Sequence, residues 1–122
     1  MTGLPLLVID ASAALALVLA DEEGDDVAAL VRDVIERNGQ LQVPSLFWYE
    51  MGSGILTAVR RGRVDERAWH EASSLMDGLP FVTDPEEGDA TRSRVWSLAQ
   101  AHEPTYYDAA YLELARRLRF RL

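Results

Sequence analysis

The sequence contains no cysteine and no lysine, and it has only two histidines among its 122 residues. Without cysteine there is neither a disulfide framework nor a thiolate metal site. Without lysine there is no amine for a Schiff base and no lysine for a phosphate-binding loop. The two histidines, His70 and His102, stand alone without the spacing of metal ligands. These absences exclude several classes of enzyme and leave oxygen ligands as the candidates for any metal.

Acidic residues outnumber basic ones, 20 to 12, which gives a net charge of −8. Such a chain does not bind nucleic acid through its overall charge, so a nucleic-acid partner requires a local basic patch or a metal. Two arginine clusters, at 60–63 and 116–121, are either solvated helix ends or the contacts for phosphate groups. We expect the acidic runs at 21–26 and 84–89 to be solvated loop and helix-start charges.

No hydrophobic run is long enough to cross a membrane. The most apolar stretch, from Leu4 to Ala20, is interrupted by Pro5, Asp10 and Ser12, and no positive charge precedes it. It therefore matches neither a membrane helix nor a secretory signal, and we expect a cytoplasmic protein without a membrane partner. Length and composition indicate a single globular domain over residues 1–122.

Short apolar runs alternate along the chain with stretches of helical periodicity. The run from Leu6 to Ile9, which ends at Asp10, is typical of a buried parallel strand. We expect strands at 6–9, 41–43 and 81–83, and the start of a fourth at 120–122. The first two helices are expected at 12–19, capped by Ser12, and from Asp25 to a stop at Asn38–Gly39. Four more are expected at 45–61, 65–76, 87–102 and 105–118. This alternation predicts an α/β fold whose parallel sheet, of about four strands, is covered by helices on both faces.

Two acidic residues occupy positions that conflict with their chemistry. Asp10 ends the most apolar strand, at the edge of the sheet where α/β proteins bind ligands, although it could simply cap the next helix. Asp108 falls on the same helical stripe as Tyr111 and Ala115, which predicts a buried carboxylate that needs a partner. The alternative is a first-turn acid, because Thr105 and Asp108 have the spacing of a capping box.

A third acid, Glu50, borders the apolar stripe of its predicted helix. Gly52 and Gly54 lower the stability of that helix, which indicates close packing on their side, although an exposed glutamate would explain Glu50 equally well. If Asp10, Glu50 and Asp108 converge, they cannot all stay ionised without a cation. Oxygen ligands favour a hard ion, Mg²⁺ or Mn²⁺, which suits phosphoryl chemistry.

The blocks that contain these acids resemble the PIN-domain ribonucleases, and most closely the VapC toxins of bacterial toxin–antitoxin pairs. The resemblance rests on three blocks in order: the segment from Val8 to Ala13, the spacing from Pro44 to Glu50, and the segment from Thr105 to Ala115. It implies a three-layer α/β/α sandwich with acids gathered at the carboxyl ends of the strands. It also implies cleavage of RNA with Mg²⁺ or Mn²⁺, with Asp10, Glu50 and Asp108 as catalytic metal ligands and Ser12 as an ancillary hydrogen-bonding residue. The expected partners are a VapB-type antitoxin and a second copy of the chain.

The sequence departs from this family pattern at its end. The toxins usually carry a fourth acid soon after a segment resembling 120–122, and this sequence ends before that position. We therefore expect a weakly held second metal and impaired activity, and the alternative function is a non-catalytic PIN-fold module that sequesters an antitoxin. A receiver-like signalling domain shares the length and the α/β pattern, but the absence of lysine argues against it.

Overall fold

The computed structural model describes residues 5–19, 24–85, 88–102 and 105–119. In these residues the chain alternates strands and helices, as the sequence predicts. The strands are β1 (Leu6–Val8), β2 (Gln40–Val43) and β3 (Phe81–Thr83). The helices are α1 (Ala11–Val18), α2 (Gly24–Glu36), α3 (Leu46–Arg60), α4 (Ala68–Asp77), α5 (Asp89–His102) and α6 (Tyr106–Arg119). The strand expected at 120–122 lies outside the described residues.

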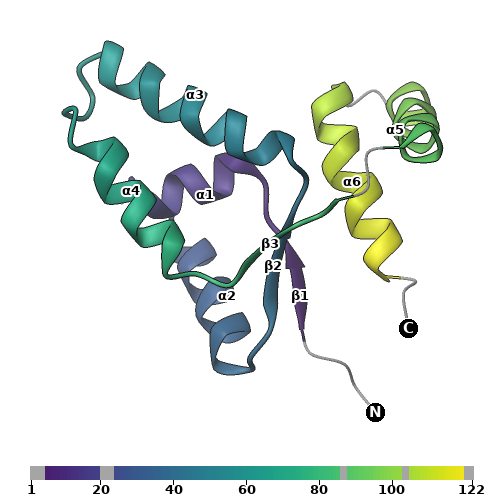
Figure 1. Cartoon of the computed structure of the whole chain (residues 1–122), viewed down its shortest axis with the longest axis horizontal. Coiled ribbons are helices and arrows are strands. Elements are labelled where there is room, and N and C mark those ends of the chain that lie inside the picture. The colour runs from purple at the N-terminus through teal and green to yellow at the C-terminus, as the bar shows by residue number, and fades with distance from the viewer. Residues whose placement is uncertain (1–4, 20–23, 86–87, 103–104, 120–122) are drawn as a thin grey trace.

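The described strands form one parallel sheet in the order β1-β2-β3. Leu7 pairs with Leu41 and Leu41 with Phe81, so that the three strands end at the same edge. Helices α1 to α4 lie on one side of the sheet and α5 and α6 on the other, which gives the predicted three-layer α/β/α sandwich (Figure 1). The segments that follow β1 and β2, namely the starts of α1 and α3, consequently lie at one edge of the sheet.

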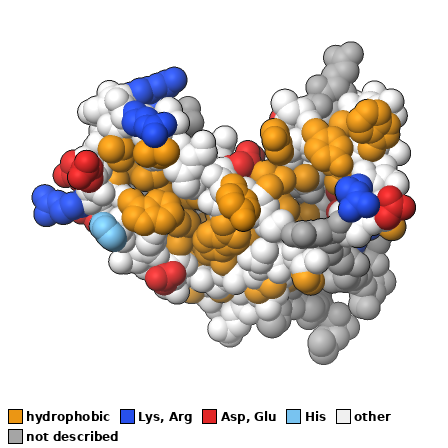
Figure 2. Space-filling view, turned by 45° about the horizontal axis from the view of Figure 1, so that its top comes forward, with side chains coloured by type: hydrophobic (Ala, Val, Ile, Leu, Met, Phe, Trp, Pro, Cys, Tyr) orange, Lys and Arg blue, Asp and Glu red, His pale blue; other side chains and the backbone are white. Residues whose placement is uncertain are grey.

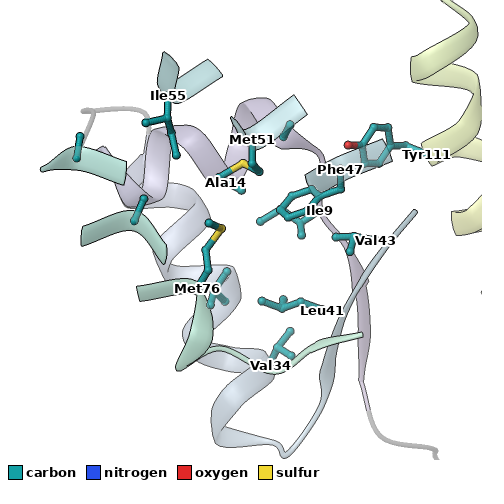
Figure 3. Packing of buried hydrophobic residues seen from close by; sticks show 14 residues of the cluster. Ile9, Ala14, Val34, Leu41, Val43, Phe47, Met51, Ile55, Met76 and Tyr111 are labelled. Atoms are coloured by element: carbon teal, nitrogen blue, oxygen red, sulfur yellow. The ribbon is translucent and has the colours of Figure 1, made fainter. Parts of the chain in front are cut away.

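The main hydrophobic core fills the space between the sheet and α1 to α4 (Figure 3). Leu41 and Val43 of β2 are fully buried because helices cover both faces of this central strand. Phe47 and Met51 of α3 pack onto them, and Tyr111 reaches into the same cluster from α6. The core therefore connects the two helical layers at the carboxyl end of the sheet.

Helix α3 is anchored to the sheet by an aromatic cluster at its first turn. The rings of Phe47, Trp48 and Phe81 lie 5.0 to 5.3 Å apart, in edge-on or tilted arrangements that favour aromatic contact. The Trp48 indole N–H also donates a hydrogen bond of 2.8 Å to the hydroxyl of Thr83, at the end of β3. These contacts fix the direction in which α3 leaves the sheet.

A buried ion-pair network joins α6 to the end of β3, and it corrects an expectation from the sequence. Asp84 and Arg117 are not solvated: Asp84 is 7% exposed and receives two hydrogen bonds, of 2.9 and 2.7 Å, from the Arg117 guanidinium. The same guanidinium binds Glu113, one turn earlier on α6, which also accepts from Arg94 of α5. Burial alone would raise the pKa of Glu113, but the hydrogen bonds from Arg117 and Arg94 outweigh it and hold that pKa below its usual value. The helical spacing of Glu113 and Arg117 was visible in the sequence. The pairing of Arg117 with Asp84 was not.

The start of α1 differs from the prediction as well. The N-cap residue is Asp10 and not Ser12, since the Asp10 carboxylate accepts a hydrogen bond of 2.9 Å from the Ala13 amide. The predicted stop of α2 is confirmed, because Asn38 adopts a left-handed conformation with φ of 57°. Among the described helices, none has the length and hydropathy needed to cross a bilayer.

We predict that Arg117→Met lowers the free energy of unfolding by about 3 to 5 kcal/mol, because it leaves the buried carboxylate of Asp84 without a counter-charge and that of Glu113 with Arg94 alone. Urea denaturation followed by circular dichroism measures the change. The matched control is Arg116→Met, since Arg116 is exposed on the same turn and its loss is expected to cost less than about 0.5 kcal/mol. Equal effects of the two substitutions would contradict a stabilising role for the network.

Candidate active site

Asp10 lies where β1 gives way to α1, immediately after the buried Ile9. Its side chain is exposed, and only Oδ1 is used in capping α1. The capping role considered from the sequence is therefore real. It leaves Oδ2 free to bind a ligand at the carboxyl edge of the sheet.

Glu50 lies in the second turn of α3 and is half-buried. Its Oε1 accepts a hydrogen bond of 2.6 Å from the Tyr111 hydroxyl of α6. One turn further along α3, Gly54 packs directly against the Leu15 side chain of α1, which would have to shift to make room for a Cβ. The close packing that the sequence predicted is confirmed at Gly54, whereas a side chain at Gly52 would meet only an ordinary contact with Trp69. Gly54 thus lets α1 approach α3 next to Glu50.

Asp108 is exposed in the first turn of α6, so the expectation of a buried carboxylate was wrong. Its backbone N–H donates a hydrogen bond of 3.0 Å to the Thr105 hydroxyl, as the capping-box alternative predicted. Burial on α6 starts with Ala109, directly after Asp108, and continues at Tyr111. Asp108 and Tyr111 still share one face of the helix, three residues apart.

The Tyr111 hydroxyl is the point at which elements remote in sequence meet. Burial, and then the hydrogen bond and charge of Glu50, raise the pKa of Tyr111, and the charge of Asp10 adds to the effect. A backbone hydrogen bond with Ala11 acts in the opposite direction. Asp10 and Glu50 therefore both act on this hydroxyl, which stays protonated at physiological pH. The sequence analysis placed Tyr111 on the core-facing stripe and missed this role, since its partner Glu50 is 61 residues away.

None of the ion pairs among the described residues involves Asp10, Glu50 or Asp108. A carboxylate set without arginine counter-charges has the donor chemistry that hard cations prefer. In the described ranges, however, no three acidic or histidine side chains are grouped closely enough to hold an ion as they stand. The residue types fit a divalent metal, and Asp10 and Glu50 both act on the Tyr111 hydroxyl.

Ser12, the predicted ancillary residue, is exposed in the first turn of α1. It lines a groove between α1 and α3 of about 250 Å³, together with Gly54, Thr57, Arg61 and Arg63. On the face that includes α3 and α6, acidic side chains are visible in a hollow that hydrophobic side chains flank on both sides (Figure 2). Asp10 and Asp108 are thus accessible from solvent, and the groove that Ser12 lines also carries two arginines.

The family model of the PIN domain matches residues 7–122 of the chain. The chain belongs to the PIN domain family. PIN domains are generally nucleases and typically use divalent metals, so the family supports nuclease activity at an acidic site. None of the curated proteins matches the chain.

The two roles of Asp10 make different demands on its side chain. We predict that Asp10→Ala lowers the free energy of unfolding by about 1 kcal/mol, because the cap of α1 is lost. Asp10→Asn should change it by less than about 0.5 kcal/mol, since asparagine caps a helix as well as aspartate does. Urea denaturation separates the two, and a large loss for Asp10→Asn would show that the charge itself supports the fold.

Proposed function

We propose that the chain is a metal-dependent endoribonuclease of the VapC toxin type. The observation that carries the proposal is the placement of Asp10, Glu50 and Asp108 on α1, α3 and α6, in the order of the PIN pattern and without an arginine counter-charge among the described residues. Two other acids, Asp84 at the end of β3 and Glu113 on α6, are neutralised by arginines. The contrast between these neutralised acids and the three that form no ion pair in the described ranges supports a cation-binding site, and argues against a mere general excess of acidic residues.

Asp10, Glu50 and Asp108 are the residues that would hold Mg²⁺ or Mn²⁺. Bound there, the ion supplies an activated water and compensates the charge that develops on the phosphodiester. Asp10 presents Oδ2 from the end of β1, where its capping bond fixes the side chain. Asp108 is exposed in the first turn of α6, and in this proposal its carboxylate reaches the ion by a change of rotamer.

The groove next to Ser12 offers a path for the RNA backbone. In the part of the chain that the structure describes, five arginines form ion pairs: Arg37, Arg67, Arg92, Arg94 and Arg117. Arg61 and Arg63 form none among the described residues and line the groove. Arg61 follows Glu50 by 11 positions, which is about 16 Å along a helix and roughly the length of five stacked nucleotides. In an acidic protein, these two arginines are the best-placed contacts for phosphate.

The partners follow from the same site. An uncompensated acidic hollow attracts a cationic segment, and an antitoxin of the VapB type would cover it and block access of RNA. The toxin assignment also implies a homodimer and a cytoplasmic location. A non-catalytic PIN-fold module that sequesters the antitoxin is the alternative, and it is favoured by the lack of a ready group of three ligands in the described residues.

We predict that Asp10→Asn and Asp108→Asn each reduce Mn²⁺-dependent cleavage of RNA by more than about 100-fold, because the loss of a ligand exceeds the usual effect of losing a ligand's supporting hydrogen bond. Cleavage is followed on a mixed set of labelled RNAs, with Asp77→Asn, an exposed acid at the end of α4, as the control. Full activity in both variants would refute the assignment. A wild-type protein that binds antitoxin but cleaves no RNA would favour the binding module.

A second prediction concerns the groove. Arg61→Gln combined with Arg63→Gln should reduce the salt dependence of RNA binding, lowering the slope of log K against log salt by about 1.4, since each phosphate contact in single strands contributes about 0.7. Binding is measured by fluorescence anisotropy of single-stranded RNA with EDTA present, so that no cleavage occurs. Arg119→Gln, an exposed arginine at the end of α6, is the control, and an unchanged slope in the double variant would place the RNA elsewhere.

A further inference from the structure

Tyr111 has a hydroxyl that the hydrophobic core does not require. The side chain is 9% exposed and belongs to the main core cluster, where phenylalanine would fill nearly the same volume. Its hydroxyl is nevertheless directed at Glu50, with an O–O distance of 2.6 Å, which is characteristic of a hydroxyl donating to an ionised carboxylate.

This hydrogen bond involves only one of the two carboxylate oxygens of Glu50. Oε1 accepts from Tyr111, whereas Oε2 makes none of the hydrogen bonds or ion pairs that occur among the described residues. A glutamate on a helix surface samples many rotamers, and fixing one oxygen removes most of that freedom. The Tyr111 hydroxyl that fixes Glu50 also lies close enough to the start of α1 to be affected by the backbone of Ala11 and the charge of Asp10.

We propose that Tyr111 is the positioning residue of the acidic site, which fixes Glu50 through Oε1 and leaves its second carboxylate oxygen for a cation. The proposal rests on the proposed metal site, and it assigns the arrangement of that site to a bond between α6 and α3. Hydrogen-bonded partners of metal-binding carboxylates typically change metal affinity by about 10- to 100-fold when they are removed.

The test is the direct binding of Mn²⁺ to the whole chain, measured by titration calorimetry without RNA. Tyr111→Phe removes one oxygen atom and should weaken Mn²⁺ binding by about 10- to 100-fold. Tyr49→Phe is the matched control, because Tyr49 adjoins Glu50 in sequence but is 82% exposed, and it should bind Mn²⁺ like the wild type. Equal affinity of Tyr111→Phe and the wild type would overturn the proposal.

Two further measurements separate positioning from a purely structural role. In a Glu50→Gln background, Tyr111→Phe should cause no further loss of Mn²⁺ affinity, since both changes act through one carboxylate. A loss of equal size in both backgrounds would show that Tyr111 acts on the fold in general.

The metal-free protein provides an independent readout. A double-mutant cycle of Tyr111→Phe and Glu50→Gln in urea denaturation should show a coupling between the two side chains, and its absence would contradict the hydrogen bond itself. A wild type that binds no Mn²⁺ would refute the metal-dependent function and the positioning of Glu50 for a metal together. A wild type that binds Mn²⁺ with unchanged affinity in Tyr111→Phe would refute the positioning alone.

Discussion

The short parallel sheet forces carboxylates that repel one another toward a common edge. The strands β1 and β2 end together, so the helices that follow them, α1 and α3, begin side by side. Helix α6 packs on β1 from the opposite layer and adds Tyr111 at the same place. Among the described residues neither Asp10 nor Glu50 forms an ion pair, and the side-chain partner of Glu50 is the hydroxyl of Tyr111.

Asp84 and Glu113 form a second acidic group, in which arginines neutralise the carboxylates. Asp84 and Glu113 are almost fully buried, and their charge is balanced by Arg117 and Arg94 with hydrogen bonds of 2.7 to 3.1 Å. Such a network tolerates burial because every carboxylate has a partner. It holds α6 to the end of β3 and α5 to α6, and so orients the helix that carries both Tyr111 and Asp108 toward the edge of the sheet.

The sequence predicted the elements well because their signals are local. Strand β3 has the predicted limits, and the stop of α2 at Asn38 follows from a backbone conformation that asparagine tolerates. Asp84 was expected to be solvated and is buried, whereas Asp108 was expected to be buried and is exposed. Both predictions were wrong because each depends on where a helix end lies relative to the sheet. Periodicity assigns a residue to a face of a helix, but it does not say how far along the helix that face remains covered.

The role of Tyr111 also could not be predicted from helical periodicity alone. Its place on the core-facing stripe was evident, and a buried tyrosine needs a partner for its hydroxyl. The partner could be any acceptor that the tertiary fold brings within reach, and Glu50 precedes it by 61 residues. Because the bond is made between two helices on opposite sides of the sheet, it exists only when both layers are docked. The geometry of the acidic site is therefore a product of the assembled core, which explains why the residue types could be named from the sequence while their arrangement could not.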